Sequence, residues 1–248
     1  MPPSPSLFRV ILVRPQVPEN VGAAARSMKA FGFNQLILVN PGFSWERRGA
    51  AYKTASGAGE IIERTRIYPT LEESLAECHR VAGFTRRSYA FPRAQGDLAG
   101  WAAPLQADAP PRKTALVFGP EDRGLSNAER NLCHHLVRIP TAAETLSLNL
   151  AQAVTVVLYE LSKTLRFTPA SESPAPSSKD APATQADLER ILQNAQEILD
   201  STTFFKPGRR EPQVEILRYL IQRLALTSAE YETVMGILQA LRQARGGR

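Results

Sequence analysis

Residues 116–125 read LVFGPEDRGL, and this stretch decides how the chain folds. The apolar run that ends at Gly119 is typical of a buried strand, which we predict over residues 114–119. An acid, a base and a second glycine follow, and a capping box at Ser126-x-x-Glu129 then begins a short helix. Backbone amides exposed after such a strand can hold polar atoms of a ligand. The alternative is a well-made turn that carries a surface ion pair.

Strand-like and helix-like segments alternate on both sides of this stretch. Short apolar runs predict strands over residues 8–13, 35–40, 81–85 and 136–139. Helices are predicted over residues 20–31, with Asn20 as a possible N-cap and Gly32 as the stop, over 45–58 (weakly, with a glycine interruption), over 70–77, and from Asn149 onward. This alternation predicts parallel βαβ units and therefore an α/β fold, with a parallel sheet covered by helices on both faces.

Parallel sheets of this kind bind ligands at the carboxyl ends of their strands, so we expect the site in the loops after Val13, Thr85, Gly119 and Ile139. Several common sites are excluded because their motifs are absent from the sequence. There is no G-x-x-x-x-G-K-[ST] loop, no G-x-G-x-x-G after the first strand, no G-x-S-x-G elbow and no H-E-x-x-H. The chain is therefore predicted to be neither a Walker-type NTPase nor an ordinary Rossmann enzyme.

Three further segments place polar side chains at the same edge. Residues 18–26 read PENVGAAAR, in which Gly22 lets the helix pack closely or lets a ligand approach. Residues 146–153 read LSLNLAQA, and their serine and asparagine can cap a helix or bind a ribose. Residues 84–87 read FTRR, and the arginines can contact phosphate or belong to a solvated charge run.

The composition bounds the class of protein. The 248 residues suggest one or two domains, and a net charge of +6 with a pI of about 9.6 is the usual footprint of a polyanion binder, although ordinary basic proteins share it. Cys78 and Cys133 are each followed directly by histidine, a spacing that does not suit a metal site, so no metal is expected. With no secretory signal and no apolar run of membrane-spanning length, we expect a cytoplasmic protein.

A composition change divides the chain. Residues 168–184 are rich in Pro, Ser and Ala and are predicted to be a linker. It separates a sheet domain over residues 1–167 from a small all-α extension over residues 185–248, where three amphipathic stripes predict three helices.

Three of the segments together resemble the motifs of the SPOUT-class RNA methyltransferases, in their TrmH/SpoU branch. The first motif is Asn20-x-Gly22-x-x-x-Arg26, the second is Gly119-x-Glu121-x-x-Gly124-Leu125, and the third runs from Ile139-Pro140 through Ser147-Leu148-Asn149. The helical tail, with Phe204-Phe205 and Met235-Gly236-Ile237-Leu238, resembles the C-terminal extension of the TrmJ subfamily. The resemblance thus covers nearly the whole chain.

The resemblance implies a C-terminal trefoil knot in the sheet domain, S-adenosyl-L-methionine (SAM) as methyl donor, and a homodimer in which each site is completed by the partner subunit. It further implies tRNA as the substrate, with 2′-O-methylation of nucleotide 32, a cytidine or uridine of the anticodon loop. Its catalytic positions correspond to Arg26, Asn20, Ser147, Asn149 and Glu121. Its SAM-binding positions correspond to Phe84, Thr85, Arg86, Gly119, Ile139, Leu146, Ser147 and Leu148. For contacts to the tRNA backbone we nominate the basic residues Arg9, Arg47, Arg48, Lys53 and Arg87.

The resemblance places Arg26 nearest the target ribose. Because a guanidinium is effectively always protonated, we expect Arg26 to anchor a phosphate and stabilise negative charge on oxygen, and not to act as a base. Ser147 and Asn149 would orient the hydroxyl, and Glu121 would fix Arg26 or Asn20. The alternatives are an rRNA ribose methyltransferase, a base methyltransferase, and an RNA-binding protein of this fold that has lost catalysis. The intact motif residues argue against the last of these.

Overall fold

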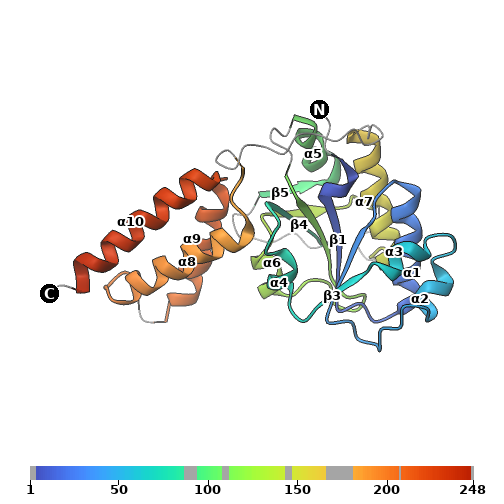
Figure 1. The fold of residues 1–248 in the computed structure, drawn as a ribbon, viewed down its shortest axis with the longest axis horizontal. Helices are drawn as coiled ribbons and strands as arrows, with labels where there is room; N and C mark the ends of the chain where they lie inside the picture. Colours follow the sequence, from blue (N-terminus) through green and yellow to red (C-terminus); the bar gives the residue numbers. More distant parts are fainter. Residues whose placement is uncertain are drawn as a thin grey trace. The chain divides into compact units, whose positions relative to one another are not determined.

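The structure, a computed structural model, describes residues 4–86, 94–107, 112–142, 147–165, 181–206 and 208–246. The chain forms two compact units, Met1–Glu172 and Ser173–Arg248 (Figure 1). Each unit is described by itself below. Most of the predicted linker, residues 168–180, lies outside the described residues.

The first unit is built on a parallel sheet in which seven strands are described, in the order β3-β2-β1-β6-β4-β7-β5. The strands are β1 Phe8–Val13, β2 Gln35–Val39, β3 Arg66–Tyr68, β4 Arg80–Phe84, β5 Ala94–Asp97, β6 Thr114–Phe118 and β7 His135–Arg138. β6 lies at the centre, where Thr114 is in register with Phe8 of β1 and with Arg80 of β4. The loop of the stretch 116–125 therefore leaves from the middle of the carboxyl edge.

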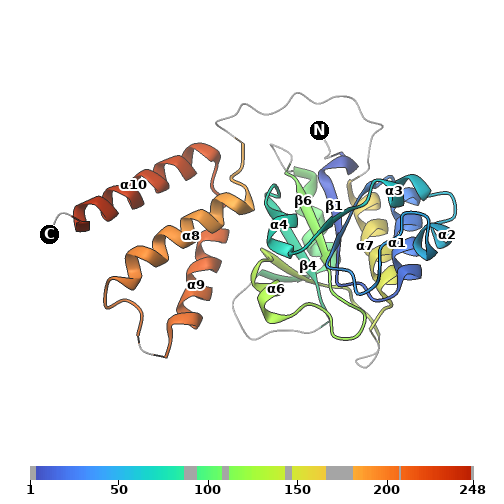
Figure 2. The ribbon, with the colours of Figure 1, turned by 60° about the horizontal axis from the view of Figure 1, so that its bottom comes forward.

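Helices cover both faces of this sheet. The described helices are α1 Pro18–Ala30, α2 Ala50–Thr54, α3 Gly59–Glu63, α4 Leu71–Leu75, α5 Leu98–Ala102, α6 Asn127–Asn131 and α7 Leu150–Leu165, with 3-10 helices η1 Pro5–Leu7 and η2 Ala103–Ala107. α1, α2, α3 and α7 lie on one face, and α4 and α6 lie on the other (Figures 1 and 2). The predicted α/β fold is confirmed, whereas the trefoil knot is not tested by these elements and stays a prediction.

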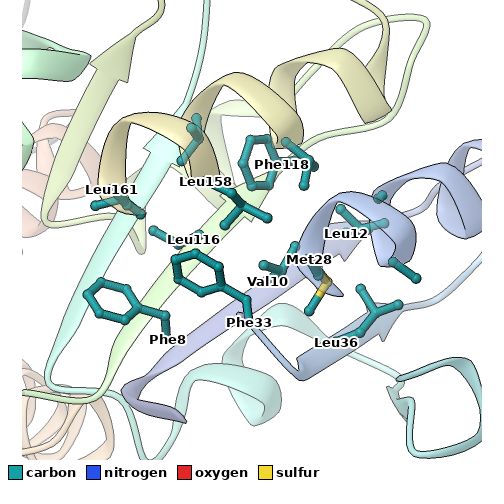
Figure 3. Packing of buried hydrophobic residues seen from close by; sticks show 14 of the residues in the cluster. Phe8, Val10, Leu12, Met28, Phe33, Leu36, Leu116, Phe118, Leu158 and Leu161 are labelled. Carbon is teal, nitrogen blue, oxygen red and sulfur yellow. The ribbon is translucent and has the colours of Figure 1, made fainter. Parts of the chain in front are cut away.

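The strands bury apolar residues on both faces, as expected for a doubly covered parallel sheet. In β1, Val10 and Leu12 pack with Leu116 and Phe118 of β6 into the cluster under α1 and α7 (Figure 3). The alternate residues of the same strands, Ile11, Val13, Ala115 and Val117, belong to the cluster under α4 and α6. Both cysteines, Cys78 and Cys133, are buried in this second cluster, and neither forms a disulfide. No group of potential metal ligands occurs within the described residues.

Helix α1 begins earlier than predicted. Pro18 occupies its first turn and Val17 is its N-cap, so the expectation that Asn20 caps this helix is wrong. Proline suits the first helical position because its fixed φ is already helical and its missing N–H has no partner there in any case. Asn20 therefore lies inside the first turn, where its side chain is free to bond elsewhere. The predicted stop is confirmed, since Gly32 adopts a φ of +81° directly after the helix.

The other predicted elements differ from the structure only where the sequence signal is weak. The five predicted strands are all present. Of the weak helix predicted over residues 45–58, only residues 50–54 are helical, as α2. Ser56 and Gly57, which both have positive φ, follow it, and α3 begins beyond the predicted range. β5 was not predicted because its sequence, AQGD, contains no β-branched or aromatic residue.

The second unit is a bundle of three described helices, α8 Gln185–Asp200, α9 Arg210–Arg223 and α10 Ser228–Gly246. Its core is small and consists of Ala183, Leu188, Ile191, Leu192 and Ile221, with partly buried residues of α9 and α10 packed around them. The predicted helical extension is confirmed. No described helix of either unit has the length and apolar character needed to cross a membrane.

His135, the first residue of β7, gives the first unit a pH-dependent stability. Burial, and then the charge of Arg80, lower its pKa from 6.5 to about 4. Because the pKa is lowered in the folded state, the unfolded chain binds the proton more tightly. Stability is therefore complete above about pH 6.5 and decreases as the pH falls toward 4, by on the order of 2 kcal/mol. Urea unfolding from pH 7 to pH 4 should show a smaller decrease for His135→Gln than for the wild type. Parallel curves for the two proteins would contradict the assignment.

Candidate active site

A pocket lies at the carboxyl edge of the sheet, over the ends of β4, β6 and β7. Its lining comes from residues 84–86, 118–125, 139, 141, 147, 148, 150 and 153. The volume of the pocket that is open to the centres of water molecules is about 200 Å³. Phe84 and Phe118 contribute stacked rings, with centroids 4.7 Å apart and 12° between their planes. This is the edge at which a parallel sheet is expected to hold its ligand.

The structure brings the predicted SAM-binding residues together in this pocket. Every one that is described contributes to the lining, namely Phe84, Thr85, Arg86, Gly119, Ile139, Ser147 and Leu148. Leu146 lies outside the described residues. Gly119 cannot be replaced without distortion, because a Cβ on it would lie 2.3 Å from the amide nitrogen of Leu125. The absence of a side chain at this position thus allows the loop after β6 to fold tightly back on itself.

Three of the predicted catalytic residues form a hydrogen-bonded chain at the pocket. The Nδ2 group of Asn149 donates to Oδ1 of Asn20 at 3.0 Å, and the Nδ2 group of Asn20 donates to Oε1 of Glu121 at 2.8 Å. The other carboxylate oxygen of Glu121 accepts the backbone N–H of Gln16 at 3.0 Å. The chain thus joins the loop after β1, the start of α1, the loop after β6 and the start of α7.

Asn149 also begins helix α7. Its Oδ1 accepts the N–H of Ala151 at 2.8 Å, and Oε1 of Gln152 accepts the N–H of Asn149 at 3.0 Å. Both predicted roles of Asn149, capping and a polar contact at the site, therefore belong to one side chain. Since its amide is already engaged twice, Asn149 is suited to positioning Asn20. Ser147 and Thr141 are exposed hydroxyl residues of the pocket, and Ser147 is the one that belongs to a motif segment.

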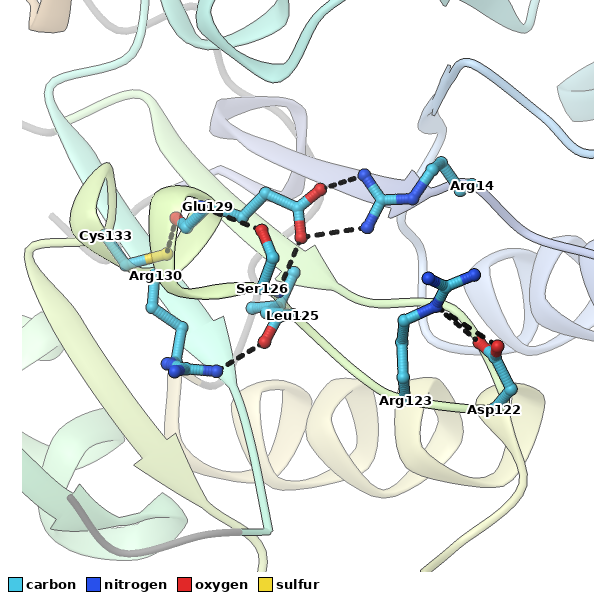
Figure 4. A network of polar contacts seen from close by, with 8 residues as sticks. All are labelled: Arg14, Asp122, Arg123, Leu125, Ser126, Glu129, Arg130 and Cys133. Atoms are coloured by element: carbon cyan, nitrogen blue, oxygen red, sulfur yellow. Dashed lines mark hydrogen bonds and ion pairs between the residues drawn. The ribbon is translucent and has the colours of Figure 1, made fainter.

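An ion pair behind the pocket fixes the loop after β1. Both guanidinium NH groups of Arg14 donate to the carboxylate of Glu129, which also accepts the N–H of Ser126 at 2.7 Å (Figure 4). The Glu129 side chain is only 9% exposed, against 35% for Arg14. Burial raises the Glu129 pKa, but the hydrogen bonds from Arg14 and Ser126 outweigh burial and leave that pKa below its usual value. The pair holds Arg14, two residues before Gln16, in a left-handed conformation with a φ of 45°.

Replacing Arg14 by methionine should destabilise the protein by about 2 kcal/mol at pH 7, because a largely buried carboxylate loses its partner while the arginine is partly exposed. The lowered pKa of Glu129 means that the pair stabilises the fold above the unfolded pKa and loses its effect as the pH falls through the folded pKa. Urea unfolding at pH 7 and at pH 3 should therefore show a smaller cost at pH 3. Arg123→Met is the control, since the pair of Arg123 with Asp122 is exposed and should contribute less than about 1 kcal/mol. Equal costs for the two substitutions would contradict the role of Arg14.

Arg26 does not line the pocket of its own chain. It lies six residues beyond Asn20 on α1, about 9 Å farther along the helix axis. Its side chain is exposed and has no hydrogen-bond or ion-pair partner within the described part of the chain. The sequence left open whether Glu121 fixes Arg26 or Asn20. In the structure, Glu121 accepts a hydrogen bond from Asn20.

The residues nominated for the tRNA backbone fall into three groups. Arg47 and Lys53 are exposed, and Arg48 is exposed although it lies 3.5 Å from Glu63. Arg87 lies outside the described residues. The nomination of Arg9 is withdrawn, because the residue is 8% exposed, its guanidinium bonds Glu77 and it begins β1 at the edge opposite the pocket. The sequence around Arg9 could not indicate this, because the acid that pairs with the buried arginine lies 68 positions away.

Sequence reasoning missed Arg14 and Gln16. The only signal for them is their position directly after β1, at the ligand edge of the sheet. Glu129 was recognised, but only through its capping box, which the structure contains. The same carboxylate both caps α6 and binds Arg14, and the second role depends on a residue 115 positions away.

Comparison with known proteins agrees with this geometry. Residues 7–159 match the SpoU rRNA Methylase family. The chain is 34% identical to the tRNA (cytidine/uridine-2′-O-)-methyltransferase TrmJ of Cronobacter sakazakii, over 96% of this chain and 97% of that protein. Its structure resembles the crystal structure of TrmJ from Z. mobilis ZM4, with a TM-score of 0.80, 32% identity, and coverage of 94% of this chain and 98% of that one.

A more distant structure shows the cofactor of the family. The SpoU methyltransferase AviRb from Streptomyces viridochromogenes, solved in complex with AdoMet, is 26% identical with a TM-score of 0.51, and covers 64% of this chain and 60% of that one. The three motif segments, the pocket they form and the full-length likeness to TrmJ all agree. The chain therefore belongs to the SpoU rRNA Methylase family, where its full-length relatives include TrmJ enzymes.

Proposed function

We propose that the protein is a SAM-dependent tRNA methyltransferase that modifies the 2′-hydroxyl of nucleotide 32, a cytidine or uridine, and acts in the cytoplasm as a homodimer. The observation that carries the proposal is the hydrogen-bonded chain from Asn149 through Asn20 to Glu121, set beside a pocket at the carboxyl edge. The likeness to TrmJ proteins over nearly the full length supports tRNA over rRNA as the substrate.

The pocket residues fit SAM. Apolar side chains, among them Ile139, Leu148 and Leu150, offer a surface for an adenine ring, while the turn at residues 119–124 presents backbone polar groups. The lining carries the carboxylates of Glu121 and Asp122 together with the guanidinium groups of Arg86 and Arg123, which suits a ligand that, like SAM, bears both positive and negative groups. When bound, SAM supplies a methyl group that is activated by its positively charged sulfur. The sulfur is already a good leaving group, so the protein does not need to activate it.

The protein's own residues are left with positioning and charge stabilisation. Ser147, exposed in the pocket, would accept a hydrogen bond from the 2′-hydroxyl and align it for in-line attack, and the proton that the hydroxyl loses on methylation would pass to water. Asn20 is held in one orientation by Asn149 and Glu121, so it can contribute to this alignment without reorganising. A guanidinium near the ribose, that of Arg26, would bind the adjacent phosphate and stabilise the developing negative charge.

The placement of Arg26 supports a site shared between two subunits. The resemblance implies a homodimer with shared sites, and Arg26 stands away from the pocket of its own chain. Exposed apolar side chains on and beside the same pair of helices, Val17 before α1 and Val156 and Tyr159 on α7, support a dimer contact there. α1 and α7 pack on each other, with a 2.6 Å hydrogen bond between Ser27 and Thr155. We therefore propose that Arg26 of one subunit serves the pocket of its partner.

Methyl transfer from tritiated SAM tests the proposal. Unmodified tRNA should be labelled, and tRNA whose nucleotide 32 lacks the 2′-hydroxyl should not be. Equal labelling of both would retain the methyltransferase but move its target to another nucleotide. Labelling of rRNA alone would overturn tRNA as the substrate, and label in a base after nucleoside mass analysis would overturn ribose as the acceptor.

A further inference from the structure

The turn between α8 and α9 exposes aromatic and basic side chains together. Phe204 is 48% exposed, and Phe205, Lys206, Arg209 and Arg210 follow it in the sequence. We call the described residues 204–206 and 208–210 the aromatic turn. The function proposed above gives this turn no role.

The aromatic turn holds Phe204 in place without covering it. The N–H of Phe204 donates to Oγ1 of Thr202 at 3.0 Å, and its carbonyl accepts Nε2 of Gln213 at 3.2 Å. The other side-chain atom of Gln213, Oε1, accepts the N–H of Lys206 at 3.1 Å. A ring whose backbone is bonded on both sides loses little further freedom when a ligand stacks on it.

The neighbouring groups are already engaged. The ring of Phe205 meets that of Phe204 edge to face, with centroids 5.2 Å apart, and the guanidinium of Arg210 lies 5.2 Å from the centroid of Phe205. Arg210 is in turn fixed on Asp200 by bonds of 2.8 and 2.7 Å. Phe205, Arg210 and Asp200 thus form a connected set of contacts that ends at Phe204, and the exposed ring of the aromatic turn is that of Phe204.

Two cations of the aromatic turn remain available. The side chains of Lys206 and Arg209 are exposed and have no hydrogen-bond or ion-pair partner in the part of the chain that is described. The nearest carboxylate of α8, that of Asp200, is occupied by Arg210. An exposed apolar ring, with exposed cations two and five residues farther along the same turn, matches a ligand that has an aromatic face and nearby negative charge, which is the chemistry of an unpaired nucleotide.

We propose that the aromatic turn is a second RNA-binding site, in which the base of an unpaired nucleotide stacks on Phe204 while Lys206 and Arg209 bind the flanking phosphates. The site would bind tRNA through the second unit, whereas the reacting ribose is bound by the first unit, and to that extent it rests on the proposed function. A protein partner would fit less well. The purely aliphatic stripe of Ile216, Leu220 and Leu224 on α9 is the surface suited to protein, and it contains no aromatic ring.

Binding of RNA to the full-length protein tests this site. The probe is a fluorescein-labelled, single-stranded RNA of twelve nucleotides and mixed sequence, followed by anisotropy, and the same preparations are assayed for methyl transfer to tRNA. Phe204→Ala should weaken binding about 5- to 100-fold, and Phe204→Trp should restore it. Leu241→Ala is the matched control, because Leu241 is 50% exposed on α10 but has no aromatic face, and it should leave binding unchanged.

Salt dependence tests the cations separately. The double variant Lys206→Gln, Arg209→Gln should reduce the slope of log Kd against log salt by about 1.4, as expected for two lost phosphate contacts on a single strand. Arg242→Gln, which removes an arginine paired with Glu197, should leave the slope unchanged.

The outcomes separate this site from the proposed function. Wild-type affinity in Phe204→Ala, or no binding of the probe by the wild type, would overturn the site even if tRNA is methylated normally. Loss of binding in Phe204→Ala together with absent methylation of tRNA by the wild type would retain the site and remove the proposed function. Equal loss in Phe204→Ala and Leu241→Ala would show general damage to the helical unit and also overturn the site.

Discussion

Replacing Arg26 by alanine should lower the rate of methyl transfer by about 10²- to 10³-fold, the loss typical of removing one preorganised charge from a transition state. SAM affinity should not change, because Arg26 does not line the pocket of its own chain. Arg26→Lys should recover only a small part of the rate, since an ammonium cannot make the two parallel bonds of a guanidinium. Single-turnover rates with tritiated SAM and calorimetry of SAM binding measure the two effects. Near-normal turnover of Arg26→Lys would contradict bidentate binding.

A mixing experiment tests which subunit Arg26 serves. Arg26→Ala keeps an intact pocket, and Glu121→Ala keeps an intact Arg26, although each protein alone is expected to be inactive. If the arginine acts across the dimer, mixed dimers contain one complete site, and subunit exchange in an equal mixture should restore about a quarter of the wild-type activity. If it acts within its own chain, no mixed dimer contains a complete site and activity should stay absent. The second result would remove the shared site from the proposal.

Replacing Gly22 by alanine should destabilise the first unit by about 3 kcal/mol, because overpacking against backbone is not easily relieved. A Cβ at this position would lie 2.2 Å from the carbonyl oxygen of Ala51 and 2.8 Å from Cβ of Thr54, so α1 and α2 would have to separate. The melting temperature of the first unit should fall by about 6–12 °C, which calorimetry can measure.

Gly236→Ala is the matched control for this substitution. Gly236 also lies within a helix, α10, but a Cβ there meets nothing within 4 Å. The change should stabilise the second unit by about 0.5–1 kcal/mol, because alanine loses less backbone entropy in a helix than glycine. Destabilisation of similar size at both positions would mean that helix propensity, and not the contact between α1 and α2, decides the effect at Gly22.

Much of the fold could be predicted because its strands are buried on both faces. Runs such as residues 8–13 and 114–118 consist largely of apolar residues, and burial selects such runs whatever their neighbours are. The short edge strands β3 and β5 could not be predicted, since sequences such as AQGD are compatible with a strand only when a neighbour supplies the hydrogen bonds. Their structure is determined by tertiary contacts, which local pattern does not contain.

The site could be predicted in its parts but not in its connections. Asn20, Glu121 and Asn149 lie in segments at the ligand edge of the predicted sheet and were assigned to the site through the motif resemblance, and the structure links them. The start of α1 was misplaced because asparagine and proline both favour a helix start, and proline, two positions earlier, prevails. Which partner Glu121 takes, and that Arg9 is buried beside Glu77, depend on residues far away in the sequence.

The central position of β6 has a consequence during translation. β1 is fully buried in the finished sheet, yet its neighbour β6 begins at Thr114, more than a hundred residues after Phe8. A ribosome needs about 5–20 s to add that length of chain at typical rates. Throughout this time the apolar sequence FRVILV has no partner on one side. Nascent chains of this protein are therefore expected to be chaperone clients until β6 leaves the exit tunnel. The contacts of α8 with α9 and α10 all lie within residues 185–246, so the second unit should fold soon after its synthesis.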